Sequence, residues 1–198
     1  DVYRRQVPEG GIVDGVELVD EGLARLDRPI GTWLLLFPCW WSVAMAWTGV
    51  ADWWFFAAFG LGAMIMRGAG CTFNDILDRD LDAQVARTAH RPIASGRIAV
   101  KHAVVFGIGL AGVGALVLLQ LGTAAIAIGL LSLVLIFPYP YMKRLTWWPQ
   151  AWLGITFNWG ALVGWAAVTG GLAAPALALY AAGIAWTLGY DTIYAHQD

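Results

Sequence analysis

The sequence predicts an all-α membrane protein, a bundle of six transmembrane helices. Three observations support this prediction. Only 13% of the 198 residues are charged, whereas soluble domains have about 25%. Hydrophobic residues make up 59% of the chain. They gather in runs near the roughly 20 residues that a helix needs to cross a bilayer. The six runs cover residues 30–48, 53–66, 104–119, 123–141, 150–168 and 175–193.

Polar segments and short turns divide the chain around these runs. Residues 1–28 are polar and are predicted to form a lead-in, and residues 29–198 form the membrane domain. The second run continues through Arg67 and Cys71 into an acidic motif. Asp52, Gly122 and Gly170 mark short turns between spans. We expect both cysteines, Cys39 and Cys71, to be small buried hydrophobic residues, because each lies in or beside an apolar run.

The positive charges fix the orientation of the predicted spans. With six spans, all twelve Lys and Arg residues fall on one side of the membrane, as the positive-inside rule requires. The connections at 49–52, 120–122 and 169–174 contain neither residue. The acidic motif and residues 190–198 then lie on the inner side. The near balance of 12 basic and 14 acidic residues reflects this topology, and we expect no nucleic-acid partner.

Four carboxylates crowd into the stretch from Asn74 to Asp82. On a helix, Asn74, Asp78 and Asp82 share a face at spacings of four, and Asp75 lies beside it. Like charges at this spacing repel, and beside a bilayer they are poorly solvated. The oxygen ligands suit Mg²⁺, which often bridges one or two carboxylates to a substrate phosphate. A solvated acidic loop is the alternative. Asp80 points away and is predicted to pair with Arg79 or another base.

A second acidic site closes the chain. Asp191, Tyr194 and Asp198 share a helical face at i, i+3 and i+7. Two spans thus end in acids on the same membrane face, an arrangement that suits metal ions held between two helices with diphosphate bridging them. An exposed acid at a helix end is the more ordinary explanation of Asp191 alone.

Basic residues near these acids could bind diphosphate or a carboxylate. Membrane topology alone also gathers Lys and Arg on the inner side. Arg67 and Arg144 stand out because both adjoin hydrophobic spans. Asn158 is a polar residue at membrane depth, and it could instead form a hydrogen bond between helices. The basic candidates are Arg67, Arg87, Arg91, Lys101, Lys143 and Arg144.

Several of these runs resemble the UbiA-type intramembrane prenyltransferases. The first is Asn74-Asp75-x-x-Asp78-x-x-x-Asp82, followed by Arg87-Thr88 and Arg91-Pro92. The second is Tyr190-Asp191-Thr192-x-Tyr194-Ala195-x-Gln197-Asp198. Residues 25–33, 141–144 and 149–150 narrow the match to members that act on 4-hydroxybenzoate in ubiquinone biosynthesis. The resemblance runs from about residue 23 to the end.

The resemblance implies a fold, a reaction and a set of site residues. Family members have nine helices, so we expect the six spans to be the first two-thirds of such a protein, with further aspartates beyond Asp198. Mg²⁺ would be the cofactor, held by Asn74, Asp78, Asp82 and Asp198. The substrates would be polyprenyl diphosphate and 4-hydroxybenzoate, joined at the ring carbon ortho to the hydroxyl. Membrane lipid and other enzymes of ubiquinone synthesis would be partners.

The implied site divides into catalytic and substrate-binding residues. The catalytic set is Asp75, Asp78, Asp82, Asp191 and Asp198. The substrate-binding set is Arg67, Asn74, Arg87, Arg91, Lys101, Tyr141, Lys143, Arg144, Asn158 and Tyr194. Arg144, and after it Arg67, is expected to bind the benzoate carboxylate. Faces of Tyr139, Tyr141 and Tyr194 could stabilise an allylic cation by cation–π contact.

Two other functions fit parts of the pattern. One is a prenyltransferase for another quinone or haem precursor. The other is an ion-coupled transporter, in which intramembrane acids bind the coupling ion near the bilayer midplane. The acids here cluster at the inner ends of spans beside basic residues, which favours a phosphate-bearing substrate. The expected location is a bacterial or mitochondrial inner membrane, with the acidic motifs on the cytoplasmic or matrix side.

Overall fold

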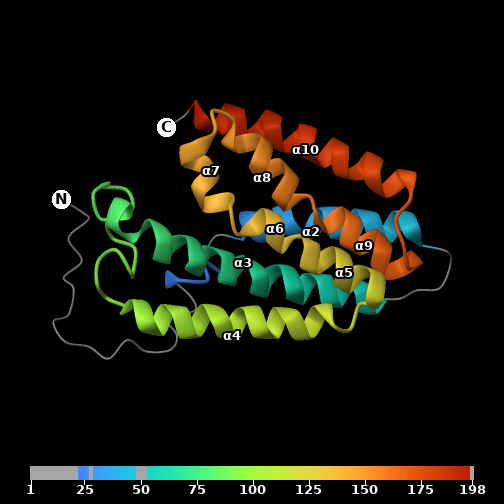
Figure 1. Cartoon of the computed structure of the whole chain (residues 1–198), viewed down its shortest axis with the longest axis horizontal. Helices are drawn as coiled ribbons and strands as arrows, with labels where there is room; N and C mark the ends of the chain where they lie inside the picture. The colour runs from blue at the N-terminus through green and yellow to red at the C-terminus, as the bar shows by residue number, and fades with distance from the viewer. Residues whose placement is uncertain (1–21, 27–28, 48–52, 197–198) are drawn as a thin grey trace.

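The computed structural model describes residues 22–26, 29–47 and 53–196, and this part of the chain is a bundle of α-helices without strands (Figure 1). The side chains of Lys143 and Arg144 lie outside the description. The helices are α2 (Ile30–Ala46), α3 (Trp53–Asp82), α4 (Val100–Leu118), α5 (Thr123–Leu131), α6 (Leu133–Ile136), α7 (Tyr139–Leu145), α8 (Pro149–Phe157), α9 (Gly160–Thr169) and α10 (Ala174–Ala195).

The six predicted spans are all present as helical segments, and two of them are interrupted. The fourth span is divided into α5, α6 and α7, and the fifth into α8 and α9. The Ser132 hydroxyl donates to the Gly129 carbonyl at the first break, 2.6 Å away. Pro138 begins the next segment because it has no N–H to continue the helix. Interruptions of this kind leave the hydropathy of the span unchanged, so the apolar runs did not predict them.

Helix α3 is longer than its predicted apolar run and carries the whole acidic motif. It continues unbroken for 30 residues. At 1.5 Å per residue it is about 45 Å long, which exceeds the roughly 30 Å hydrocarbon core of a bilayer. One end of α3 must therefore extend past the hydrocarbon. The end that carries Asp78 and Asp82 is the polar one, so the acids lie on a rigid helix and not on a loop.

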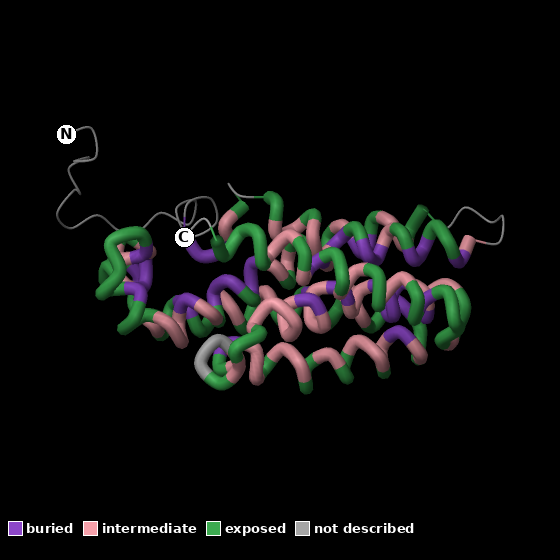
Figure 2. Tube along the Cα trace, turned by 90° about the horizontal axis from the view of Figure 1, so that it is seen from above, coloured by how far each residue is buried: buried purple, intermediate pink, exposed green. Residues whose placement is uncertain are grey.

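The chain is an integral membrane protein by the length and composition of its helices. Four segments are long and apolar enough to cross a bilayer: Trp53–Asp82, Val100–Leu118, Thr123–Met142 and Pro149–Thr169. Helix α2 is apolar but has only 17 residues. Helix α10 has 22 residues, about 33 Å. Helix α4 exposes Val105, Ile108 and Leu116, as expected of a lipid-facing surface. Figure 2 shows exposed positions along the outer sides of the bundle.

The charged connections gather at one end of the bundle. The α3–α4 connection, the α7–α8 connection and the end of α10 lie together at the left in Figure 1. The α4–α5 and α9–α10 connections, which carry no Lys or Arg, lie at the opposite end. The predicted separation of charge is therefore confirmed for these connections. The side of the membrane that the charged end faces stays a prediction.

The main core lies where α2 and α9 cross. Leu36, Cys39 and Val43 of α2 pack with Val163 and Ala166 of α9, joined by residues of α3 and α5. Small residues allow this close approach: a Cβ on Gly164 would lie 2.8 Å from the Cys39 carbonyl oxygen. Cys39 and Cys71 are both buried and free, as predicted.

A smaller core holds the polar end of the bundle together. Leu23, from the segment before α2, packs with Ile93 and Ile98 of the α3–α4 connection and with Ala103 of α4. Ile76 of α3 covers this cluster. The small core therefore anchors two irregular segments beside the acidic end of α3, and each segment carries an arginine.

The α2–α9 contact gives a test of the fold. We expect Gly164→Ala to destabilise the protein by about 1–3 kcal/mol, because the added Cβ meets a backbone carbonyl that cannot move independently. Gly112→Ala is the matched control, since a Cβ there meets nothing within 4 Å. Thermal unfolding of the purified protein in detergent measures both. Equal melting temperatures for the two variants would contradict the observed packing.

Candidate functional site

The acidic motif presents two neighbouring faces of α3. At 100° per residue, Arg67, Asn74 and Asp78 fall within a narrow stripe, and Asp75 and Asp82 fall on the adjacent face. The prediction had grouped Asp82 with Asn74 and Asp78 on the basis of spacings of four. That grouping needs correction. Residues seven positions apart on an α-helix point in more nearly the same direction than residues four apart, so Asp82 lies on the face of Asp75. Both carboxylates pair with Arg91.

The first face is a buried network of ion pairs. Asp75 is only 1% exposed, and its Oδ1 accepts hydrogen bonds from Arg25 at 2.5 Å and from Arg91 at 3.2 Å. Arg91 also donates to Asp82 at 2.6 Å. Two guanidinium groups thus balance two carboxylates, which a poorly solvated acidic pair requires.

The local backbone conformation places both Arg25 and Arg91 in this network. The backbone of Arg25 has φ of 51°, the left-handed region that a residue with a Cβ seldom adopts. Such a conformation persists where the surroundings hold it, here the Asp75 pair and the Leu23 core. The Thr88 hydroxyl donates to the Asp82 carbonyl at 3.0 Å, turning the chain at the end of α3. Arg91 follows three residues later and reaches back to Asp75.

The second face carries polar atoms that lack partners within the described residues. The Oδ1 of Asn74 and the Nε of Arg67 are buried and have no hydrogen-bond partner there. The Arg67 guanidinium lies over Gly31 at the start of α2, where a Cβ would collide with it. Buried polar atoms are normally bonded. An acceptor and a donor left open on one stripe therefore indicate a site for a cation and an anion together.

The start of α7 lies near this part of α3. Phe73 of α3 and Phe137, just before α7, pack edge to face with ring centroids 6.3 Å apart. Asp191, Arg67 and Asp78 all lie within electrostatic range of the Tyr139 hydroxyl in α7. Parts of the two predicted acidic motifs therefore lie in the neighbourhood of Tyr139.

The donor set fits a divalent cation of the magnesium type. Within residues 22–26, 29–47 and 53–196, no group of three or more His, Cys, Asp or Glu side chains is close enough to hold a metal. Mg²⁺ does not need such a cage, because it is commonly bound by one or two carboxylates together with substrate phosphates and waters. Asn74, Asp78 and Asp191 offer oxygen donors of this kind, and the open Oδ1 of Asn74 is the observation that supports the fit.

The other predicted residues are distributed more widely. Arg87 and Lys101 are exposed on and after the α3–α4 connection, and Tyr141 and Tyr194 are exposed on α7 and α10. Arg79 pairs with Asp80 at 3.3 Å, as predicted. The amide of Asn158 donates to Thr187 of α10 at 2.9 Å, which is the second of its two predicted roles. Asp198 and the side chains of Lys143 and Arg144 lie outside the described residues.

Two residues of this site are hard to find from the sequence pattern: Arg25 receives no site role from it, and Tyr139 only a minor one. Arg25 enters the sequence prediction only as one of the twelve basic residues that set the topology, although it belongs to the 25–33 run that carries the family resemblance. Tyr139 was named only as one of three aromatic faces, and Tyr141 was preferred from the 141–144 run. Helical phase separates the two tyrosines by about 200°, so only one of them can face α3.

A family profile and individual relatives both identify the same protein family. A profile described as the UbiA prenyltransferase family matches residues 35–198. A protein of Bos taurus named "4-hydroxybenzoate polyprenyltransferase, mitochondrial" is 55% identical over 179 residues, covering 89% of this chain and 48% of that protein. The protein of the same name from Arabidopsis thaliana is 54% identical over 183 residues, covering 89% and 44%. The chain thus spans about half the length of these curated relatives.

A solved structure agrees with the fold. The apo structure of a UbiA homolog from Aeropyrum pernix K1 superposes with a TM-score of 0.72 at 26% identity. The superposition covers 86% of this chain and 65% of that one. The arrangement of the described helices is therefore one that a homologous membrane protein adopts.

The ion-pair network gives a stability prediction. We expect Asp75→Ala to destabilise the protein by about 2–3 kcal/mol, since removing one partner of a buried pair costs about 3–5 kcal/mol and both arginines here keep some solvent contact. Asp80→Ala, in the exposed pair with Arg79, should cost less than about 1 kcal/mol. Chemical or thermal unfolding in detergent measures the difference. An Asp75 variant as stable as the Asp80 variant would show that the network does not hold the helix end.

Proposed function

This chain belongs to the UbiA prenyltransferase family, and from that premise we propose that the protein containing it is a 4-hydroxybenzoate polyprenyltransferase of ubiquinone biosynthesis. It transfers a polyprenyl group from polyprenyl diphosphate to the ring carbon ortho to the hydroxyl of 4-hydroxybenzoate. The observation that carries the proposal is the stripe of Arg67, Asn74 and Asp78, which has a buried donor and a buried acceptor without partners within the described residues. Asp191 lies within electrostatic range of the same tyrosine, Tyr139, as Arg67 and Asp78. The shared name of the relatives supports this choice over another quinone or haem precursor.

We propose that Asn74 and Asp78 hold Mg²⁺ on the α3 side, with Asp191 and Asp198 on the α10 side. Asp82 would join them only by exchanging its pair with Arg91 for the ion. When bound, Mg²⁺ supplies positive charge that stabilises the departing diphosphate. Asp75 is already engaged with two arginines, so its proposed part is to keep the helix end in place.

The proposed reaction has two chemical steps. The bond between the prenyl C1 and the diphosphate oxygen breaks, and the electron pair leaves with the diphosphate. The ring carbon ortho to the hydroxyl attacks the allylic cation, and that carbon then gives its proton to the released diphosphate, which restores aromaticity. We propose that Tyr139, whose hydroxyl lies within electrostatic range of Asp78 and Asp191, presents its ring to the cation. The lipid-facing bundle excludes water, which would otherwise capture the cation.

For the benzoate carboxylate we propose Arg67, the second choice from sequence; the side chain of Arg144, the first choice, lies outside the described residues. The Nε of Arg67 is buried with no partner, and its guanidinium lies on the same stripe as Asn74. A planar guanidinium binds a carboxylate through two parallel hydrogen bonds. We further propose that the charged end of the bundle faces the cytoplasm or the mitochondrial matrix, in line with the positive-inside rule.

The metal assignment is tested by Asp78→Ala. In membranes supplied with polyprenyl diphosphate, 4-hydroxybenzoate and Mg²⁺, product formation should fall by about 100-fold or more, because stabilisation of the leaving group is lost. Asp80→Ala serves as the control, since its carboxylate is exposed and pairs with Arg79. Chromatographic detection of the prenylated acid is the measurement. Near-normal product from the Asp78 variant would refute the assignment.

The carboxylate assignment is tested by Arg67→Lys. The charge is kept and the bidentate geometry is lost, so KM for 4-hydroxybenzoate should rise about tenfold while the Mg²⁺ dependence stays as in the wild type. Arg79→Lys provides a matched control at an exposed position. If KM were unchanged in the Arg67 variant, the acceptor would have to bind elsewhere.

A further inference from the structure

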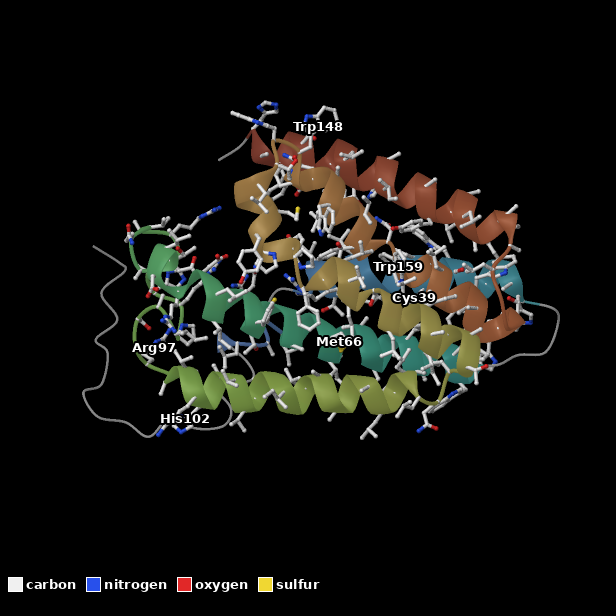
Figure 3. All side chains as sticks on the ribbon, in the orientation of Figure 1. Cys39, Met66, Arg97, His102, Trp148 and Trp159 are labelled. Atoms are coloured by element: carbon white, nitrogen blue, oxygen red, sulfur yellow. The ribbon has the colours of Figure 1, made fainter. Side chains whose placement is uncertain are left out.

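Three successive residues at the α8–α9 break contact three different helices. Asn158 donates to Thr187 of α10. The indole of Trp159 donates to the Ile128 carbonyl of α5 at 2.9 Å. A Cβ on Gly160 would collide with the sulfur of Cys39 in α2. Figure 3 labels Trp159 and Cys39, which lie close together at this point. The break is therefore a junction of the bundle.

The side chain of Asn158 forms one hydrogen bond within its own helix and one to α10. Its Nδ2 donates to the Gly154 carbonyl of its own helix at 2.8 Å and to the Thr187 hydroxyl at 2.9 Å. Asn158 is 5% exposed and Thr187 is 2% exposed. Polar groups at such depth are costly unless they are paired, so the two residues require each other.

The same face of α10 is shaped around this pair. A Cβ on Gly183 would collide with Oδ1 of Asn158, and a Cβ on Gly154 would lie 3.2 Å from the Ile184 carbonyl oxygen. One turn earlier, the Tyr180 hydroxyl donates to the Ile155 carbonyl at 2.9 Å. Tyr180, Gly183 and Thr187 follow one another at helical spacing and form the side of α10 that packs on α8.

Asp191 continues this side of α10 by one turn. It lies four residues after Thr187 and is partly buried, whereas residues 192–196 are exposed. Turning α10 by one residue, about 100°, or sliding it by one turn would separate Asn158 from Thr187 inside an apolar bundle. Buried polar pairs are known to fix the register of packed helices in this way.

We propose that Asn158 and Thr187 are positioning residues that set the rotation and height of α10 and thereby hold Asp191 in the neighbourhood of Tyr139, within reach of the same group as Asp78. The inference rests on the proposed function for its consequence, since Asp191 is assigned there to the Mg²⁺–diphosphate site. It assigns Asn158 to this hydrogen bond and not to direct contact with substrate.

The variants are chosen so that each change has a matched partner. Thr187→Val removes the hydroxyl at constant shape, and Thr187→Ser restores it. Gly183→Ala drives a Cβ into Asn158, whereas Gly189→Ala adds the same Cβ on the same helix with nothing within 4 Å. Should Gly183→Ala fail to fold, the Thr187 pair carries the test alone.

The first measurement reports the position of α10 without any metal or substrate. Spin labels are placed on exposed Ile193 of α10 and exposed Val105 of α4, and both native cysteines are buried. We expect the distance distribution from pulsed electron resonance to shift or broaden in Thr187→Val and Gly183→Ala. It should match the wild type in Thr187→Ser and Gly189→Ala. Superposable distributions in all four variants would overturn the inference.

The second measurement separates positioning from general loss of structure. In Thr187→Val, the Mg²⁺ concentration for half-maximal prenyl transfer should rise about three- to twentyfold, the range that corresponds to one interhelical hydrogen bond. KM for 4-hydroxybenzoate should stay within about twofold, because the Arg67 stripe lies on α3. A shifted distance with an unchanged Mg²⁺ requirement would also overturn the inference.

Failure of the proposed function would look different. If the wild-type protein formed no prenylated 4-hydroxybenzoate, the proposed reaction would fall, and the label distances would still decide whether Asn158 and Thr187 set the position of α10. If the wild type were active and only the label distances failed to respond, the positioning inference alone would fall.

Discussion

The acidic end of α3 can exist beside a membrane only because Asp75 is neutralised from two directions. A carboxylate that is 1% exposed would be strongly unfavourable without a positive partner. Arg25 arrives from the segment before α2 and Arg91 from the α3–α4 connection, and the small Leu23 core holds both segments in place. Asp75 thus joins these two irregular segments to α3, in addition to the contacts of the Leu23 core.

This neutralisation divides the motif into two kinds of acid. Asp75 and Asp82 face the arginines and form an internal network, although Oδ2 of Asp75 has no partner within the described residues. Asn74 and Asp78 share the other face with Arg67, where a buried donor and a buried acceptor lack partners within the described residues. A motif of four carboxylates therefore combines a structural role with a chemical one, and the helical phase decides which residue takes which role.

The breaks in the spans also create contacts between helices. In a continuous helix the backbone carbonyls accept hydrogen bonds from the same helix. At the break after α8, by contrast, Asn158, Trp159 and Gly160 contact three neighbouring helices. Pro138 likewise starts α7 afresh, and this places Tyr139 near α3. Both irregularities lie inside apolar spans, where backbone groups left without partners would be costly.

The sequence by itself determined the membrane class, the approximate positions of the helical segments and the placing of the charged connections at one end, because apolar length and charge distribution depend only on local composition. It also located both acidic motifs and identified the family through them. Tertiary structure alone decided that Arg25 and Arg91 meet at Asp75, that Tyr139 and not Tyr141 faces α3, and that Asn158 binds Thr187. The three hydrogen-bonded pairs join residues 50, 16 and 29 positions apart, and the orientation of Tyr139 depends on where a helix breaks. Helical spacing gives direction within one helix but cannot say which surface of another helix it will meet.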